Sequence, residues 1–198
     1  MNRPIRLAIN AKSLMSPFTG IAQYTRSLAL ELVASGEVDA EYFYGLGFSK
    51  ELRSAPAAGH ETAKRAVRAA IPKPYLAARL VQQAAFTLGA RGRGLDLYHD
   101  PNYLAYRFAG PTVITAHDLS WIRYPETHPA ERVEVMNRLF PTVLERADHV
   151  LTDAAFVRDE IIAEFGVDPG RITSVPLGAR TVFHPRTASE CAPVLAAR

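Results

Sequence analysis

The stretch that decides the fold is Thr112-Val113-Ile114-Thr115-Ala116-His117-Asp118-Leu119-Ser120. Its first five residues are apolar or β-branched, which favours a buried strand. The strand is followed at once by a polar pair, His117 and Asp118. In a parallel sheet, the loops beyond the carboxyl ends of the strands are where ligands bind, so this pair is a candidate for a site.

The segments on both sides of this stretch repeat the same order of strand, polar loop and helix. Six short runs are expected to be strands, namely residues 5–9, 41–46, 95–99, 112–116, 148–152 and 171–175. Helices are expected from Gly20 to about Gly36, between Lys50 and Gly94 with breaks at Pro72 and Pro74, and over 131–146 and 154–165. This alternation predicts an α/β fold, a Rossmann-like parallel sheet with helices on both faces.

Five loops follow the carboxyl ends of the expected strands, and they begin at Asn10, His99, His117, Asp153 and Pro176. Because parallel strands end at the same edge of a sheet, these loops are expected to form one rim. The sequence therefore predicts that Gly20, His99 and His117 converge there.

Length and composition fit one large α/β domain. The chain has 198 residues, of which 48% are hydrophobic, enough to fill a core. No apolar run reaches the roughly 18–20 residues of a membrane-spanning helix, and the run 5–9 is too short for a signal peptide. A single cysteine, Cys191, excludes an internal disulfide and a cysteine-based metal cluster. We therefore expect a cytoplasmic protein.

Glycine opens the first expected helix, in the sequence Thr19-Gly20-Ile21-Ala22-Gln23-Tyr24. Glycine lets a ligand approach the backbone closely, and the free amides of a helix N-terminus bind phosphate. Ala22 stands where a second glycine would complete a GxGxxG motif. The alternative is a helix start that needs a flexible residue and binds nothing.

Two histidines at one rim, His99 and His117, could bind sugar hydroxyls or phosphate, or exchange protons near neutral pH. The alternative for each is a buried imidazole that holds its loop in place. Tyr103, Trp121 and Tyr124 lie in the same loops and could either stack on sugar rings or pack the loops. No HExxH zinc motif and no Gly-x-Ser-x-Gly elbow occurs in the sequence.

Taken together, these segments resemble the retaining GT-B glycosyltransferases of family 4, notably bacterial mannosyltransferase-like members. The matching residues extend over most of the chain, while Lys50 to Gly94 contributes little. They are Thr19 to Tyr24, Asp96 to Tyr103, Val113 to Ser120, Tyr124-Pro125, His128-Pro129, Ala147 to Asp153 and Phe165 to Gly178.

The resemblance implies roles for particular residues. Gly20 and Ile21 would lie near the donor diphosphate, and His117 would lie beside the transferred sugar as the catalytic residue. The acceptor or sugar contacts would be His99, Asn102, Tyr103, Asp118 and Trp121. The family transfers sugar with retention of configuration, without metal or cofactor, and stabilises leaving-group charge electrostatically. Two positions depart from the family pattern, because Ala22 replaces a glycine and Asp153 replaces a serine that many relatives carry.

The resemblance also implies that residues 1–185 form the N-terminal, acceptor-side domain and that 186–198 form a linker or a ragged C-terminus. In the family a second domain follows segments that match Val175 to Gly178 and Phe183 to Pro185, and it supplies the nucleotide pocket and a pair of glutamates. That run is absent from these residues, so the chain is expected to be a fragment of a longer enzyme and inactive alone.

The expected function is transfer of a sugar, with mannose suggested by the subgroup, from a nucleotide-sugar to a glycan or lipid-linked acceptor. A non-catalytic glycan-binding or subunit-partner module is the alternative. An unrelated Rossmann-like dehydrogenase is opposed by the absent GxGxxG motif and the absent acid after the second strand.

A basic block gives the sequence an uneven charge. Between Lys50 and Arg93 there are nine Lys or Arg residues against Glu51 and Glu61, whereas the rest of the chain carries an excess of acids. Such a block suits phosphate or an anionic membrane, although it could be a solvated helix face. The expected contacts are Lys64, Arg65, Arg68, Lys73 and Arg79, in peripheral contact with the inner face of the membrane. No nucleic-acid partner is expected.

Overall fold

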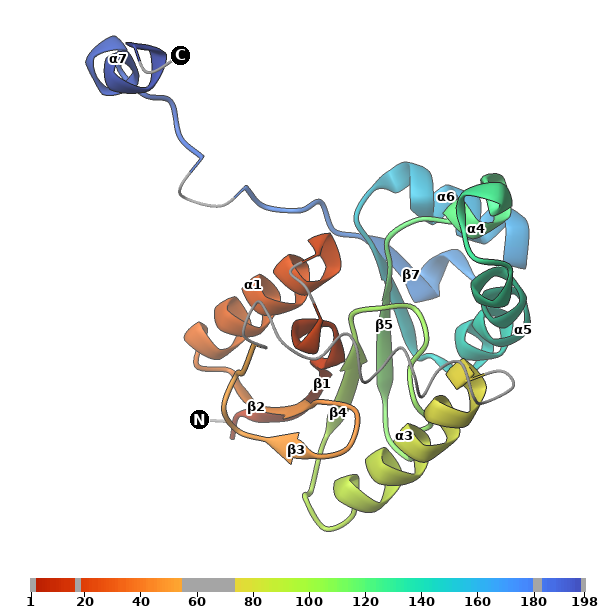
Figure 1. Cartoon of the computed structure of the whole chain (residues 1–198). Helices are drawn as coiled ribbons and strands as arrows, with labels where there is room; N and C mark the ends of the chain where they lie inside the picture. The colour runs from red at the N-terminus through yellow and green to blue at the C-terminus, as the bar shows by residue number, and fades with distance from the viewer. Residues whose placement is uncertain (1–2, 17–18, 55–73, 180–182, 197–198) are drawn as a thin grey trace.

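The computed structural model describes residues 3–16, 19–54, 74–179 and 183–196. A seven-stranded sheet with the order β3-β2-β1-β4-β5-β6-β7 forms its centre (Figure 1). Neighbouring strands pair in parallel, except that β3 is antiparallel to β2. The strands are β1 Ile5–Asn10, β2 Val38–Phe43, β3 Phe48–Ser49, β4 Leu97–Asp100, β5 Thr112–Ala116, β6 His149–Thr152 and β7 Ile172–Ser174.

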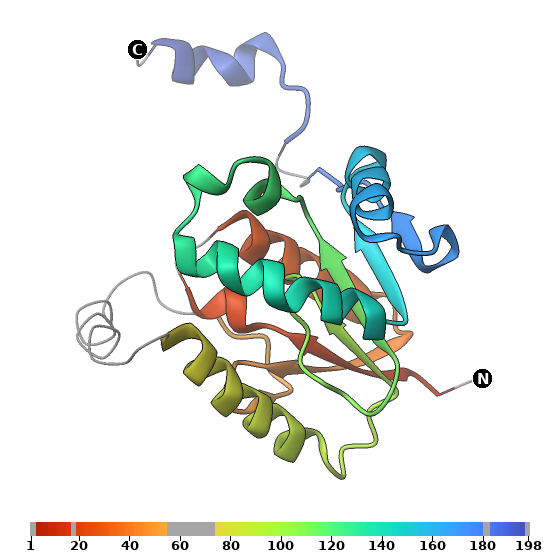
Figure 2. The same cartoon turned by 90° about the vertical axis from the view of Figure 1, so that its right-hand side faces the viewer.

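Helices connect the strands and cover the sheet on both faces (Figure 2). Short 3-10 helices add one turn each at Lys12–Met15, Pro125–Thr127 and Pro169–Arg171. The α-helices are α1 Gly20–Ala34, α3 Pro74–Ala90, α4 Ser120–Arg123, α5 Ala130–Arg146, α6 Ala155–Phe165 and α7 Ala188–Ala196. None of the helices within the described ranges combines the length and apolar character that a membrane crossing requires.

Side chains that alternate along β1 enter two separate cores. Leu7 and Ile9 pack with Ala22 and Ala29 of α1, whereas Ala8 packs on the other face. Successive side chains of a strand point to opposite faces, which explains this division. The core on the face that Ala8 enters is the larger of the two. It contains Phe86 of α3, Phe140 of α5 and Ile161 of α6, together with buried residues of β4, β5 and β6.

The predicted fold class is confirmed, and most expected strands lie within two or three residues of the observed ones. The second strand ends earlier than expected, at Phe43, because the chain turns at Gly45, whose φ is 96°. The turn leads into β3, which the sequence analysis did not predict. Of the two helices expected between Lys50 and Gly94, α3 is observed, and residues 55–73 lie outside the described part.

Within residues 186–198, expected to be a linker or a ragged C-terminus, residues 188–196 form a helix that the sequence analysis did not predict, α7. The signal was present in Thr187-Ala188-Ser189-Glu190, a capping box. The backbone N–H of Thr187 donates to the Glu190 carboxylate at 2.8 Å, and the Glu190 N–H donates to the Thr187 hydroxyl at 3.4 Å. No residue of α7 is buried, and both views show the helix apart from the sheet.

Candidate functional site

The predicted loops come together at the carboxyl edge of the sheet. Parallel pairing places the ends of β4, β5 and β6 side by side, with Asp100 opposite Ile114 and Ala116 opposite Thr152. The first turns of α1 lie over this edge. The Tyr24 hydroxyl is 3.1 Å from the Thr115 hydroxyl of β5, so the helix that Gly20 opens is fixed directly above the site.

His117 lies at the centre of this edge and is held from both sides. Its Nδ1 is 2.7 Å from the Asp153 carboxylate, and its Nε2 is 3.0 Å from the carbonyl oxygen of Pro101. Both partners can only accept hydrogen bonds, so the ring makes both bonds only when both nitrogens carry a proton. The edge of the Tyr24 ring contacts the His117 ring, with 5.0 Å between centroids. The arrangement presents an imidazole fixed at the rim by an acceptor at each ring nitrogen.

Asp153, which the sequence analysis noted only as a departure from the family pattern, is the carboxylate partner of His117. It directly follows β6, whereas His117 directly follows the neighbouring strand β5. Residues at the carboxyl ends of adjacent parallel strands lie side by side, so the two positions alone could have indicated the pair. Many relatives carry a serine at this position, and an aspartate differs from it by giving the imidazole a carboxylate partner.

His99 is buried, with only 5% of its surface exposed. Its Nε2 is 2.9 Å from the Thr115 hydroxyl, which also contacts the Tyr24 hydroxyl. Burial, together with the charge of His117, lowers the pKa of His99 to about 4, so the ring is neutral at neutral pH. The expected contact between His99 and a sugar is therefore wrong, because the side chain serves as an internal support for the site.

A buried carboxylate, Asp100, fixes the start of the same loop. It accepts hydrogen bonds from the Asn10 amide at 2.7 Å, the Tyr98 hydroxyl at 2.8 Å and the backbone N–H of Asn102 at 2.9 Å. Burial raises the pKa of Asp100, and these hydrogen bonds oppose that rise. Because the carboxylate ties β1 to the loop after β4, it positions Asn102, whose own side chain is exposed.

Two aromatic residues expected to contact sugar are part of the core. Trp121 is 1% exposed and packs edge-on against Phe140, with 5.1 Å between ring centroids. Tyr103 is 3% exposed, and its ring contacts both Trp121 and His117. The expected sugar stacking on Trp121 is therefore wrong, since the indole is enclosed by protein. Tyr124, by contrast, is 61% exposed.

Asp118 shapes the loop after β5, as expected from its position. Its carboxylate accepts hydrogen bonds from the backbone N–H and the hydroxyl of Ser120, at 2.9 and 2.8 Å. Its backbone N–H donates to the Tyr103 hydroxyl at 3.1 Å. Partial burial would raise the pKa of Asp118, but the hydrogen bonds from Ser120 and Tyr103 outweigh it and lower the pKa. The carboxylate is thus ionised, and it holds Ser120, the first residue of α4, by these hydrogen bonds.

The N-terminus of α1 is open at Gly20. The Thr19 hydroxyl accepts a hydrogen bond from the Ala22 N–H at 3.3 Å and so caps the helix. A Cβ atom at Gly20 would meet no described atom within 4 Å, and Gly20 itself is exposed. The N–H groups of Gly20 and Ile21 precede the helical hydrogen bonds and can bind a ligand.

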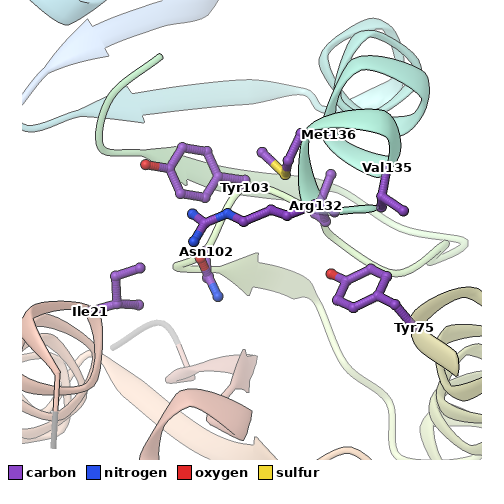
Figure 3. Close-up of a pocket in the computed structure, with 8 residues that line it drawn as sticks. Ile21, Tyr75, Asn102, Tyr103, Arg132, Val135 and Met136 are labelled. Carbon is purple, nitrogen blue, oxygen red and sulfur yellow. The ribbon is translucent and has the colours of Figure 1, made fainter. Parts of the chain in front are cut away.

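A cavity of about 240 Å³ opens beside His117, on the other side of Tyr103. Arg132, Val135 and Met136 reach it from α5, Tyr75 from the start of α3, and Ile21 from α1 (Figure 3). The remaining lining residues come from the loop after β4, namely Asn102, Tyr103 and Leu104. The sequence analysis missed Tyr75 and Arg132, because no local pattern shows how α3 and α5 lie relative to this loop.

Of the five basic residues expected to contact a membrane or an anion, the structure describes Arg79 alone, and Lys64, Arg65, Arg68 and Lys73 lie outside the described residues. The Arg79 guanidinium donates to the carbonyls of Leu104 and Ala105, each at 2.9 Å, and lies over the Tyr106 ring. Arg79 therefore anchors the loop after β4, and the expected membrane contact is wrong for this residue.

Comparison with known proteins identifies the family of this fold. The sequence pattern of Glycosyltransferase Family 4 matches residues 18–182. The chain is also 29% identical to the O-antigen chain mannosyltransferase B of Escherichia coli, in an alignment that covers 96% of this chain and 52% of that protein. The chain thus spans about half the length of the curated relative it matches. With its Rossmann-like sheet as one half of a GT-B fold, the chain belongs to glycosyltransferase family 4.

Proposed function

We propose that this chain is the N-terminal, acceptor-side domain of a retaining glycosyltransferase, formed by residues 1–185. The enzyme would transfer a sugar from a nucleotide-sugar to a glycan or lipid-linked acceptor, without a metal or cofactor. Family membership supports glycosyl transfer, and the name of the Escherichia coli relative supports mannose as the sugar. A second domain would bind most of the nucleotide, which is why the isolated chain is expected to be inactive.

The donor diphosphate would bind at the N-terminus of α1. The exposure of Gly20 supports this position, because a glycine at the start of a helix lets phosphate oxygens approach the backbone N–H groups of Gly20 and Ile21 closely. The positive end of the helix dipole would add to these contacts. The sugar attached to the diphosphate would then extend toward His117, since α1 contacts His117 through Tyr24 one turn further along.

The placement of His117 is the single observation that carries the proposal. The ring lies between the first turns of α1 and Asp153, and its two hydrogen bonds keep it there. A protonated imidazole beside the departing diphosphate would stabilise the negative charge that develops on the leaving group. Because the ring is already positioned, little reorganisation would be needed during the reaction.

The acceptor would approach over the loops after β4 and β5, where Asn102 and Asp118 are exposed. Peripheral contact with the inner face of a membrane would suit a lipid-linked acceptor. That contact now rests on Lys64, Arg65, Arg68 and Lys73 of the basic block, because Arg79 is engaged inside the protein. Sedimentation with vesicles that contain anionic lipid would test it.

Transfer by the full-length protein tests the proposed function directly. GDP-mannose is offered beside UDP-glucose as donor, with EDTA present, and product configuration is determined by NMR spectroscopy. We expect transfer from GDP-mannose with retention. Inversion of configuration, loss of activity in EDTA, or a gene that ends without a second α/β domain would each contradict a named part of the proposal.

A further inference from the structure

We propose that the cavity between α1, α3 and α5 binds an anionic group of the acceptor, a phosphate or a carboxylate, with the Arg132 guanidinium as its main contact. The proposal rests on the proposed function only in naming the ligand as a sugar acceptor. That the cavity binds an anion follows from its own residues.

The cavity has the size of a subsite rather than of a whole substrate. Its volume of about 240 Å³ is below the roughly 300–1,000 Å³ of pockets that enclose drug-sized ligands. Its lining combines apolar and polar side chains. The apolar walls are Ile21, Leu104, Val135 and Met136, and the polar groups are those of Tyr75, Asn102 and Arg132.

Arg132 is the one charged residue among the eight that line the cavity. Its guanidinium makes no hydrogen bond or ion pair with any residue that the structure describes, although its backbone N–H donates to the carbonyl of Pro129. Other arginines of this region are used by the fold. Arg79 and Arg146 both donate to carbonyls of the loop after β4. Arg132 therefore keeps its fork of N–H donors for a ligand.

Two further groups in the cavity can donate to the same ligand. The Tyr75 hydroxyl points into the space between Arg132 and Asn102 (Figure 3). Tyr75 is 45% exposed, and a phenol with its ordinary pKa of about 10 keeps its proton at neutral pH. Neither this hydroxyl nor the side-chain amide of Asn102 is hydrogen-bonded to a described residue. Three donors that converge on one space match the several acceptor oxygens of a phosphate or carboxylate.

Two acidic residues, Asp118 and Glu131, contact residues that line the cavity without lining it themselves. Asp118 accepts from Ser120, and Glu131 accepts from the backbone N–H of Tyr75 at 3.3 Å. Neither carboxylate is hydrogen-bonded to Arg132 among the described residues, although the charge of Arg132 helps to lower the pKa of Asp118. Their charges weaken the attraction for a distant anion. They therefore favour a ligand that makes close, bidentate contacts with the guanidinium over one that is held only by long-range attraction.

A single buried ring, that of Tyr103, separates the cavity from His117. Tyr103 lines the cavity, and its ring is also 5.7 Å from the His117 ring, measured between centroids. An anionic group held by Arg132 would thus lie one aromatic ring away from His117. An acceptor held there would have its neighbouring sugar at the rim, which is the placement that transfer requires.

The test titrates the 198-residue chain, labelled at methyl groups and arginine side chains, with methyl phosphate, acetate and neutral methyl α-mannoside. We expect saturable NMR shifts at Arg132, Val135 and Met136 with at least one anion. Tighter binding of methyl phosphate than of acetate assigns the cavity to a phosphate, and the reverse order assigns it to a carboxylate. Stronger binding of the mannoside than of both anions would overturn the proposal.

The matched variants are Arg132→Gln and Arg138→Gln, since Arg138 is exposed on the same helix but does not line the cavity. Arg132→Gln should weaken anion binding about tenfold or more, whereas Arg138→Gln should leave it unchanged. Both replaced side chains are exposed, so equal melting temperatures should confirm that the fold is intact. Equal anion affinity in the two variants would overturn the proposal.

Activity of the full-length protein separates this inference from the proposed function. If transfer occurs and Arg132→Gln leaves the acceptor KM unchanged, the cavity proposal fails and the function stands. If no donor supports transfer while the cavity still binds an anion through Arg132, the function fails and the cavity site stands. A raised acceptor KM with unchanged donor KM supports both.

Discussion

His99 and His117 follow one another along the same edge of the sheet, yet they differ in almost every physical property. His99 lies inside β4, is buried, and has a neutral hydroxyl as its partner. His117 lies just beyond β5, is partly exposed, and has a carboxylate and a carbonyl as its partners. The two residues have the same chemistry, so the difference arises from position alone.

The register of the two strands explains the difference. Asp100 pairs with Ile114, so His117 extends three residues further along the sheet direction than the last residue of β4. Three residues correspond to about 10 Å at about 3.3 Å per residue. That distance carries His117 out of the core and up to the rim. The comparison predicts that changes at His117 affect chemistry, while changes at His99 affect stability.

The largest effect is expected for His117→Ala in the full-length enzyme. Loss of a positioned group that stabilises developing charge should lower kcat by about a hundredfold or more, with little change in the melting temperature. Rates of transfer and of donor hydrolysis measure this effect. His149→Ala is the matched control, because His149 begins β6 at the opposite edge of the sheet. Undiminished transfer by His117→Ala would show that this residue has no catalytic role.

The next largest effect is expected for His99→Ala, and it should be on stability. Removal of a buried ring leaves a cavity and takes a hydrogen-bond partner from Thr115, which together should cost about 2–3 kcal/mol. Urea unfolding of the chain measures this cost. If the variant unfolds like the parent but loses transfer, His99 acts in the chemistry and the contrast with His117 is wrong.

The same burial predicts how stability depends on pH. The pKa of His99 is lowered to about 4 in the folded chain, against about 6.5 in the unfolded chain, so the unfolded state binds the proton more tightly between these values. Stability should therefore fall as the pH decreases from 6.5 towards 4. The contribution of His99 amounts to a loss of about 2 kcal/mol at pH 5.

Urea unfolding at pH 7.5 and pH 5, for the parent and for His99→Gln, isolates this contribution, because glutamine does not titrate. The parent should lose more stability on acidification than the variant does. An equal loss in both would mean that His99 takes up its proton as readily in the folded as in the unfolded chain.

The fold was predictable from sequence because it rests on periodic patterns. Runs such as 112–116 and 148–152 are apolar, short and separated by helical segments, and the structure confirms the parallel sheet that they indicate. The sequence also contained a local signal for α7 that the sequence analysis overlooked, because the Thr187–Glu190 capping box marks the start of this helix. By contrast, no pattern distinguishes the exposed from the buried aromatic residues of one loop.

The site was predictable only in part, for a physical reason. That His117 lies at the rim follows from the end of its strand. Whether Trp121 or Tyr103 faces a ligand depends on how α5 covers the loop, because Phe140 of α5 encloses both rings. Whether Arg132 reaches the cavity also depends on how α5 packs against this loop. Contacts between elements distant in sequence therefore decided the residues that the sequence analysis placed wrongly.

The smallest effect is expected for Asp153→Asn, which tests whether the carboxylate partner is needed for the proposed role of His117 in transfer. Asp153→Asn removes the negative charge but keeps the shape, so Nδ1 of His117 should keep a hydrogen bond without a carboxylate partner. We expect kcat to fall about tenfold, less than in His117→Ala, with the fold unchanged. Asp159→Asn on α6 is the control, since Asp159 is exposed and pairs with Arg158. A fall as large as that of His117→Ala would mean that the imidazole works only as a charged pair. No fall at all would mean that the position of the ring, and not its carboxylate partner, distinguishes His117 from His99.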